Sequence, residues 1–97
     1  MISVKVTYTV KLDFVNQNKK NIKKFLEDFR NLPGQFNYDV YLMADGVTFL
    51  HVSSYQNKDV QQTVLNTPSF VEFQKERDLS GLNGTHTVEM IEQVGKI

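Results

Sequence analysis

The feature that most constrains this sequence is the repeated change in its hydrophobic period. Over residues 4–12 apolar and polar side chains alternate, which is the pattern of a half-buried β-strand. Over residues 15–29 the apolar side chains recur at helical spacing instead. The alternation returns over residues 36–42 and again over residues 47–55. The first half therefore predicts strand, helix, strand and strand.

Turn and cap residues separate these segments. Asp13 is expected to cap the first helix, with Asn18 as the alternative start; Asp13 is preferred because Val15 lies one heptad before Ile22. Pro33-Gly34 should end that helix. Asp45-Gly46, between two strand-like runs, predicts a hairpin because both residues tolerate positive φ.

The second half of the chain predicts a helix in two pieces followed by one more strand. Residues 58–66 predict a short helix, and Thr67-Pro68 restarts it, with Thr67 as the cap and Pro68 at the first helical position. Gly81 and Gly84 should close this helix before a last strand over residues 85–94. Strand, helix, strand, strand, helix, strand predicts one ferredoxin-like α+β domain over residues 1–97. It would be a four-stranded antiparallel sheet with two helices on one face.

Composition excludes several classes of function. The chain has no cysteine, which removes disulfides, thiolate nucleophiles and the usual zinc cages, and we expect no metal site. Eleven basic and eleven acidic residues cancel, so no overall field favours nucleic acid or anionic lipid. No apolar stretch reaches the roughly 20 residues that span a bilayer, and no signal peptide is evident. We expect a cytoplasmic protein.

One face of the predicted sheet lacks a cover. Both helices lie on the other face, and the open face carries Thr7, Thr9, Tyr41 and Met43. A patch of this kind, left bare, would be a large semi-apolar surface. Two copies that pack sheet to sheet would bury it, so we expect a homodimer.

Two histidines are the candidate proton-transfer residues. His51 lies mid-strand with Phe49, Ser53 and Tyr55 on the same face. It could act as a general base, since imidazole titrates near neutral pH, or it could be a hydrogen-bonded histidine of the core or dimer seam. His86 is expected to be a solvated residue at the start of the last strand.

Aromatic residues and one arginine form a candidate ligand site. The tyrosines could line a pocket for an aromatic ligand or simply fill the core. The arginine follows a phenylalanine stripe by one helical turn, and it could bind an anionic ligand or pair with Asp78, Glu76 or an acidic residue across the dimer. The candidate ligand-binding residues are Tyr8, Tyr38, Tyr55, Phe70, Phe73 and Arg77.

From Ser53 onward the chain resembles the antibiotic biosynthesis monooxygenases, a family of dimeric α+β barrels. Tyr55 stands at the family's aromatic strand-end position, and Thr67-Pro68-Ser69-Phe70 matches its step into the second helix. Ser53 stands where the family has glutamate, and Val64 and Ser69 stand where it has histidines. The resemblance implies the barrel fold and the dimer, with much of the family's polar site replaced.

The heme-degrading branch of the same superfamily resembles residues 64–74. Here Val64 replaces its tryptophan and Gln74 its axial histidine, so we expect no heme and no other cofactor. Two functions remain open. One is a cofactor-independent monooxygenase for a small aromatic or quinol-like substrate, served by His51 and a tyrosine. The other is a non-catalytic member of the fold that binds a small hydrophobic ligand.

Overall fold

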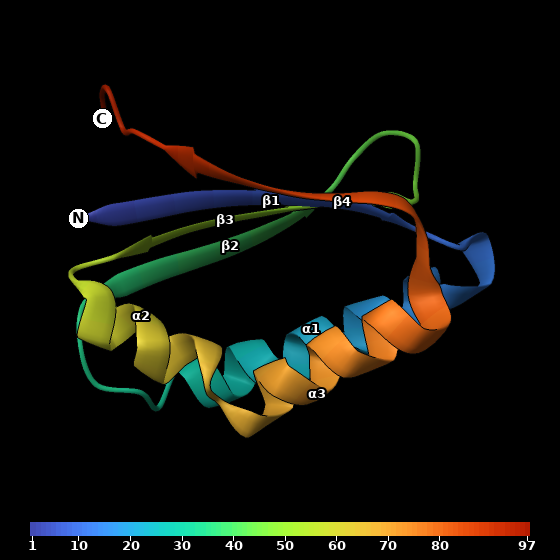
Figure 1. Ribbon diagram of the computed structural model, residues 1–97, viewed down its shortest axis with the longest axis horizontal. Helices are drawn as coiled ribbons and strands as arrows, with labels where there is room; N and C mark the ends of the chain where they lie inside the picture. The colour runs from blue at the N-terminus through green and yellow to red at the C-terminus, as the bar shows by residue number, and fades with distance from the viewer.

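The computed structural model describes all 97 residues and contains the predicted order of elements. All the helices lie on one face of a single sheet, and the two chain ends lie at the same end of it (Figure 1). The strands are ordered β2-β3-β1-β4, and all neighbours are antiparallel. The elements are β1 (Ile2–Val10), α1 (Val15–Phe29), β2 (Phe36–Leu42), β3 (Thr48–Tyr55), α2 (Lys58–Leu65), α3 (Pro68–Glu76) and β4 (Leu82–Ile91). The ferredoxin-like prediction is confirmed.

The register decides which side chains face the helices. Val6 of β1 lies opposite His51 of β3 and Val88 of β4. On the other side of β3, Val40 of β2 also lies opposite His51. Because directly opposed residues point to the same face, the even-numbered residues of β1 and the odd-numbered residues of β3 form the floor of the core. The two central strands therefore place His51 in the middle of the helix-covered face.

One predicted helix start is wrong, and another is right in position but not in its capping hydrogen bond. Asp13 does not cap α1, because it lies in a 3₁₀ turn over Leu12–Phe14, and the cap position of α1 is Phe14. Burial of the Phe14 ring takes precedence over side-chain capping there. Thr67 occupies the cap position of α3 and Pro68 its first helical position, as predicted, although the Thr67 hydroxyl donates to the Thr63 carbonyl at 3.2 Å and accepts no capping hydrogen bond.

The last strand starts earlier than predicted. Residues 77–81 form a π-helical turn, and β4 begins directly after it at Leu82 instead of Thr85. Leu82 pairs with Val10 beyond an irregularity in the ladder, which adds three residues to the strand. Beyond Ile91 the chain has no strand partner, so the strand ends three residues before the predicted Val94.

The hairpin between β2 and β3 is confirmed with one difference. Gly46 has φ +77°, whereas Asp45 keeps a negative φ. The Asp45 carboxylate instead accepts the backbone N–H groups of Val47 and Thr48, at 3.0 and 2.8 Å. Asp45 thus fixes the turn through its side chain and leaves the left-handed conformation to glycine.

The two faces of the sheet differ in what covers them. The helix-covered face holds a core of buried aliphatic and aromatic side chains. The opposite face carries Tyr41 and, beyond the end of β2, Met43, both exposed, together with a Lys5–Glu89 ion pair at 3.5 Å. None of the helices combines the length and apolar character that crossing a bilayer would require.

Candidate functional site

A cavity of about 310 Å³ lies between the helix-covered face of the sheet and helices α2 and α3. Its walls are mostly apolar and aromatic, with a few polar groups, which is the usual make-up of a small-molecule site. The polar and titratable side chains on its wall are Tyr38, His51, Ser53, Tyr55, Gln61, Gln74, Arg77 and His86. The apolar side chains are Val4, Val6, Leu65, Phe70, Phe73, Val88 and Met90.

His51 is held between two tyrosine hydroxyls. It is only 2% exposed, as expected for a central strand covered by helices. The Tyr8 hydroxyl lies 2.7 Å from Nε2, and the Tyr38 hydroxyl lies 2.8 Å from Nδ1. Both ring nitrogens are therefore already hydrogen-bonded, and a molecule in the cavity would exchange protons with His51 by way of Tyr38.

The chain of hydrogen bonds continues to Asn18 of α1. Asn18 is fully buried, and its Nδ2 donates to the Tyr8 hydroxyl oxygen at 3.0 Å. Its Oδ1 has no partner. In this orientation the amide is the donor, so the Tyr8 hydroxyl oxygen accepts from Asn18 and its own proton needs another acceptor. Asn18, Tyr8, His51 and Tyr38 form one network across four elements.

The direction of this network follows from which hydroxyl can do without a protein acceptor. A neutral imidazole carries one N–H, so one tyrosine donates to His51 and the other accepts from it. Suppose that Tyr8 accepted a hydrogen bond from His51 and donated none. Its own O–H would then be unpaired, and because Tyr8 is only 1% exposed, this would cost roughly 1–3 kcal/mol of folding free energy. Tyr8 therefore donates to Nε2, and Nδ1–H donates to Tyr38. The Tyr38 O–H is left to face the cavity.

Burial and one nearby cation set the protonation states. Burial, with a further contribution from Arg77, lowers the pKa of His51 to about 3. Burial raises the pKa of Tyr8 to about 12, although the Asn18 hydrogen bond and Arg77 oppose the shift. Burial also raises the pKa of Tyr38 well above its ordinary value. At neutral pH the network is uncharged throughout.

Arg77 reaches the cavity from the π-helical turn after α3. Its side chain is buried, and the guanidinium lies over the rings of Tyr8 and Phe73, at 4.9 and 5.3 Å from their centroids. Nε pairs with Asp78 at 3.0 Å. Single π-turns occur frequently at functional sites, because the extra residue redirects a side chain.

Gly81 explains why the π-turn can close tightly. A Cβ at this position would come within 2.2 Å of the Phe14 ring, so only glycine fits. The Gly81 carbonyl also accepts the Lys11 N–H at 2.8 Å, which ties the turn to the end of β1. The packing of Gly81 on Phe14 thus fixes the turn that carries Arg77. The sequence alone had suggested Gly81 only as the end of a helix.

His86 borders the same cavity from β4. It lies opposite Tyr8 in the ladder, and its ring stands edge-on to the Tyr8 ring with centroids 6.1 Å apart. Partial burial and then Arg77 lower its pKa. His86 is exposed, as predicted, but it belongs to the cavity wall. No group of three His, Asp or Glu side chains is arranged to hold a metal ion.

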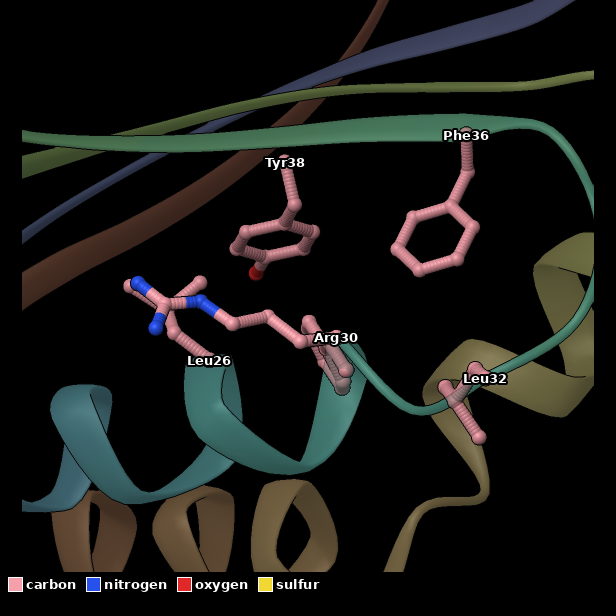
Figure 2. Close-up of a pocket in the computed structure, with 6 residues that line it drawn as sticks. Leu26, Arg30, Leu32, Phe36 and Tyr38 are labelled. Carbon is pink, nitrogen blue, oxygen red and sulfur yellow. The ribbon is translucent and has the colours of Figure 1, made fainter.

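A second hollow, of about 390 Å³, lies where α1 ends and β2 begins. Figure 2 shows Phe36 and Tyr38 extending from β2 toward Leu26 and Arg30. Its one charged group, Arg30, pairs with the exposed Glu27 at 3.3 Å. Tyr38 borders both hollows, but His51, His86 and Arg77 border only the first.

Most of the residues singled out in the sequence meet at the first cavity. Its wall includes Tyr38, His51, Tyr55, Phe70, Phe73 and Arg77. Tyr8 lies behind the wall and acts on it through His51. Asn18 was missed as a site residue, although one feature pointed to it: it interrupts the apolar stripe of Val15, Ile22 and Phe25 at a position in phase with that stripe.

Comparison with known proteins identifies the fold. No family model matches the sequence, and no curated protein is similar enough to count as a relative. Solved structures do match. An antibiotic biosynthesis monooxygenase is 14% identical, with TM-score 0.84 over 98% of this chain and 100% of that one. Rv0793 from Mycobacterium tuberculosis is 15% identical, with TM-score 0.82 over 98% and 96%.

A third similar structure carries a stated activity. SnoaB, a cofactor-independent oxygenase from Streptomyces nogalater, is 11% identical, with TM-score 0.76 over 99% of this chain and 95% of that one. The predicted resemblance to the antibiotic biosynthesis monooxygenases is thereby confirmed for the fold. At these identities the likeness carries over no individual site residue.

Proposed function

We propose that this chain, which has the fold of the antibiotic biosynthesis monooxygenases, is a cofactor-independent monooxygenase-like enzyme for a small aromatic or quinol-like substrate. The observation that carries the proposal is the cavity of about 310 Å³, walled by aromatic rings, whose polar wall includes the Tyr38–His51 pair. Aromatic walls suit a flat apolar substrate, and the Tyr38 hydroxyl can donate a hydrogen bond to an oxygen atom of that substrate.

The chemistry requires little of the protein beyond binding and proton transfer. The acidic ring methylene of the substrate gives one proton to solvent water, and the carbanion that remains attacks O₂, so that the carbon–oxygen bond formed gives a peroxide anion. Protonation gives the hydroperoxide, which loses water to leave a ketone. The sum is R₂CH₂ + O₂ → R₂C=O + H₂O, in which the substrate carbon supplies all four electrons that reduce O₂. No separate reductant is needed.

The network can supply the proton that the peroxide anion takes up. In the hydrogen-bond direction derived above, Tyr38 presents its O–H to the cavity. As that proton leaves, the Nδ1–H of His51 can replace it, and Tyr8 can replace the proton of His51. Asn18 donates to the Tyr8 oxygen and would stabilise the negative charge developing there. His51 would therefore act as a proton relay.

Oxygen uptake tests this proposal. Anthrone, the keto form of a three-ring phenol, serves as substrate, and O₂ consumption and anthraquinone formation are measured together. We expect one O₂ per anthraquinone, a strong loss in Tyr38→Phe and His51→Gln, and normal rates in Tyr41→Phe. Tyr41 is the matched control because its hydroxyl lies on the opposite face of the sheet. Equal rates in all four proteins would refute the relay.

A non-catalytic binding function is the second candidate, and one observation favours it. Both nitrogens of His51 are occupied, and burial holds its pKa near 3, so no free base faces the cavity. A binding protein would hold the same aromatic molecules without consuming O₂. Saturable binding of anthraquinone with no O₂ uptake from anthrone would support this candidate over the enzyme.

We also propose that the protein is a homodimer joined through the open sheet face. That face carries exposed Tyr41, Met43 and Ile91, and none of the chain's own helices covers it. Apolar side chains of this size favour burial against a second copy. Sedimentation at micromolar concentration should give about twice the 11.2 kDa chain mass. A single species at the chain mass would contradict the proposal.

A further inference from the structure

The charges around the cavity are one-sided. Arg77 is the only formally charged residue in its wall, and no aspartate or glutamate borders it. Both histidines of the wall are held toward the neutral form, partly by Arg77 itself. The cavity therefore presents one buried positive charge without a negative charge to balance it from within.

The hydrogen-bond donors of Arg77 are only partly used. Nε donates to Asp78, whose side chain is about half exposed and therefore solvated. The guanidinium also acts as a hydrogen-bond donor toward the Tyr8 hydroxyl, which uses only part of its terminal N–H groups, and neither terminal nitrogen is a fully enclosed, unsatisfied atom. They are thus open to whatever occupies the space beside them. A guanidinium with free terminal N–H groups is suited to a carboxylate or another oxyanion.

The second donor faces the same space. The hydrogen-bond direction of the network leaves the O–H of Tyr38 without a protein acceptor at the cavity wall. Arg77 and Tyr38 therefore both offer hydrogen atoms, and the apolar walls of Phe70 and Phe73 lie among the same lining residues. A molecule that satisfies this arrangement carries acceptor oxygen atoms with negative charge on an aromatic frame.

We infer that the cavity binds its ligand as an aromatic oxyanion, with the negative oxygen atoms held by the terminal nitrogens of Arg77. The class includes aromatic carboxylates and the enolate or phenolate forms of polycyclic phenols. The inference rests on the proposed function, because it specifies the ligand of the same cavity. It also adds a role to that function: a cation beside the substrate favours the deprotonated form that reacts with O₂.

A pair of isosteric probes tests the inference. 2-Naphthoate is an anion at neutral pH, and 2-naphthamide has the same shape without the charge. Affinities of both are measured by calorimetry on the full chain at pH 7.5. We expect 2-naphthoate to bind at least about tenfold more tightly, since a charge-assisted pair contributes more than a neutral one. Equal affinities would overturn the inference and leave the aromatic cavity standing.

Variants locate the charge that discriminates between the probes. Arg77→Met should abolish the preference for 2-naphthoate and leave 2-naphthamide binding nearly unchanged, whereas Arg77→Lys should restore part of the preference. Arg30→Met is the matched control, because Arg30 is an exposed cation outside the cavity. A preference that survives in Arg77→Met would show that another group holds the anion.

Two outcomes separate this inference from the proposal beneath it. If neither probe binds the unaltered protein, the aromatic-ligand proposal itself fails, and the oxyanion inference fails with it. If Arg77→Met does not fold, as judged by circular dichroism, the comparison of the two probes on the unaltered chain still decides the question. Weaker binding of 2-naphthoate than of 2-naphthamide would also overturn the inference.

Discussion

The helix layer has two halves that cover the same sheet in different ways. In the α1 half, Phe25 is fully buried and its ring lies 4.9–5.6 Å from those of Phe29, Tyr38, Phe70 and Phe73. In the α2/α3 half, the side chains stand apart and leave the cavity of about 310 Å³. The ring cluster around Phe25 is packed like a crystal interior, whereas the space beside α2 and α3 stays open, and a second hollow of about 390 Å³ lies beyond the cluster at the end of α1. The difference indicates that stability depends on the ring cluster, to which α1 and α3 both contribute, and binding on the open space beside it.

The largest expected effect comes from removing a ring in the packed half. Phe25→Ala should lower the free energy of unfolding by about 3–5 kcal/mol, because the change leaves a void that the neighbours cannot fill. Phe70→Ala should lower it by less, about 2–3 kcal/mol, since Phe70 already borders open space. Urea unfolding of both variants measures the difference. A greater loss in Phe70→Ala would reverse the comparison between the halves.

The second effect is a pH dependence of the free energy of unfolding, and it originates at His51. The pKa of His51 is about 3 in the folded chain and about 6.5 when unfolded, so below pH 6.5 the unfolded chain binds the additional proton. Stability should therefore fall on acidification through the window from pH 6.5 to 3. The expected loss is about 2 kcal/mol between pH 6.5 and 5, where carboxylates still remain mostly ionised.

His51→Gln separates this contribution from the others. His86, whose pKa is also lowered, acts in the same direction but is more exposed, so it should leave only a shallow residual slope in the variant. Unfolding curves at several pH values provide the measurement. An unchanged slope in His51→Gln would mean that His51 is not the group that titrates.

A third change tests the hydroxyl that connects α1 to the cavity. Tyr8→Phe removes the partner of both Asn18 and His51 and should cost about 1–2 kcal/mol, because two buried polar groups are left unpaired. Tyr41→Phe removes an exposed hydroxyl and should change stability by less than about 0.5 kcal/mol. Equal effects of the two substitutions would mean that the network contributes nothing to folding.

The smallest effect on stability is expected at the edge of the cavity. Met90 faces the helix side of β4 but is 72% exposed, so Met90→Ala should cost less than about 0.5 kcal/mol. The same substitution should weaken 2-naphthoate binding several-fold, because Met90 forms part of the cavity wall. A destabilisation as large as that of Phe25→Ala would show that the cavity half is packed like the other half.

Much of this fold could be predicted from the sequence. The alternation in β1 and the stripe of Val15, Ile22 and Phe25 were sufficient to assign the first strand and the first helix and the face that each buries. Hydrophobic period is a local property, and each segment displays it without reference to the rest of the chain. The errors occurred at Asp13 and at the start of β4, where the packing of Phe14 against Gly81 and the pairing of Leu82 with Val10 prevail over local preference.

The candidate site divides in the same way. The sequence by itself determined that His51 lies mid-strand among aromatic residues and that Arg77 follows the Phe70–Phe73 stripe. Only the tertiary structure decided that Asn18, Tyr8, His51 and Tyr38 form one network. Its bonds join residues 10, 43 and 13 positions apart in the chain. A hydrogen bond forms only when the donor–acceptor distance is right to within a few tenths of an ångström. The packing of the helices on the sheet sets these distances, and no local pattern encodes them.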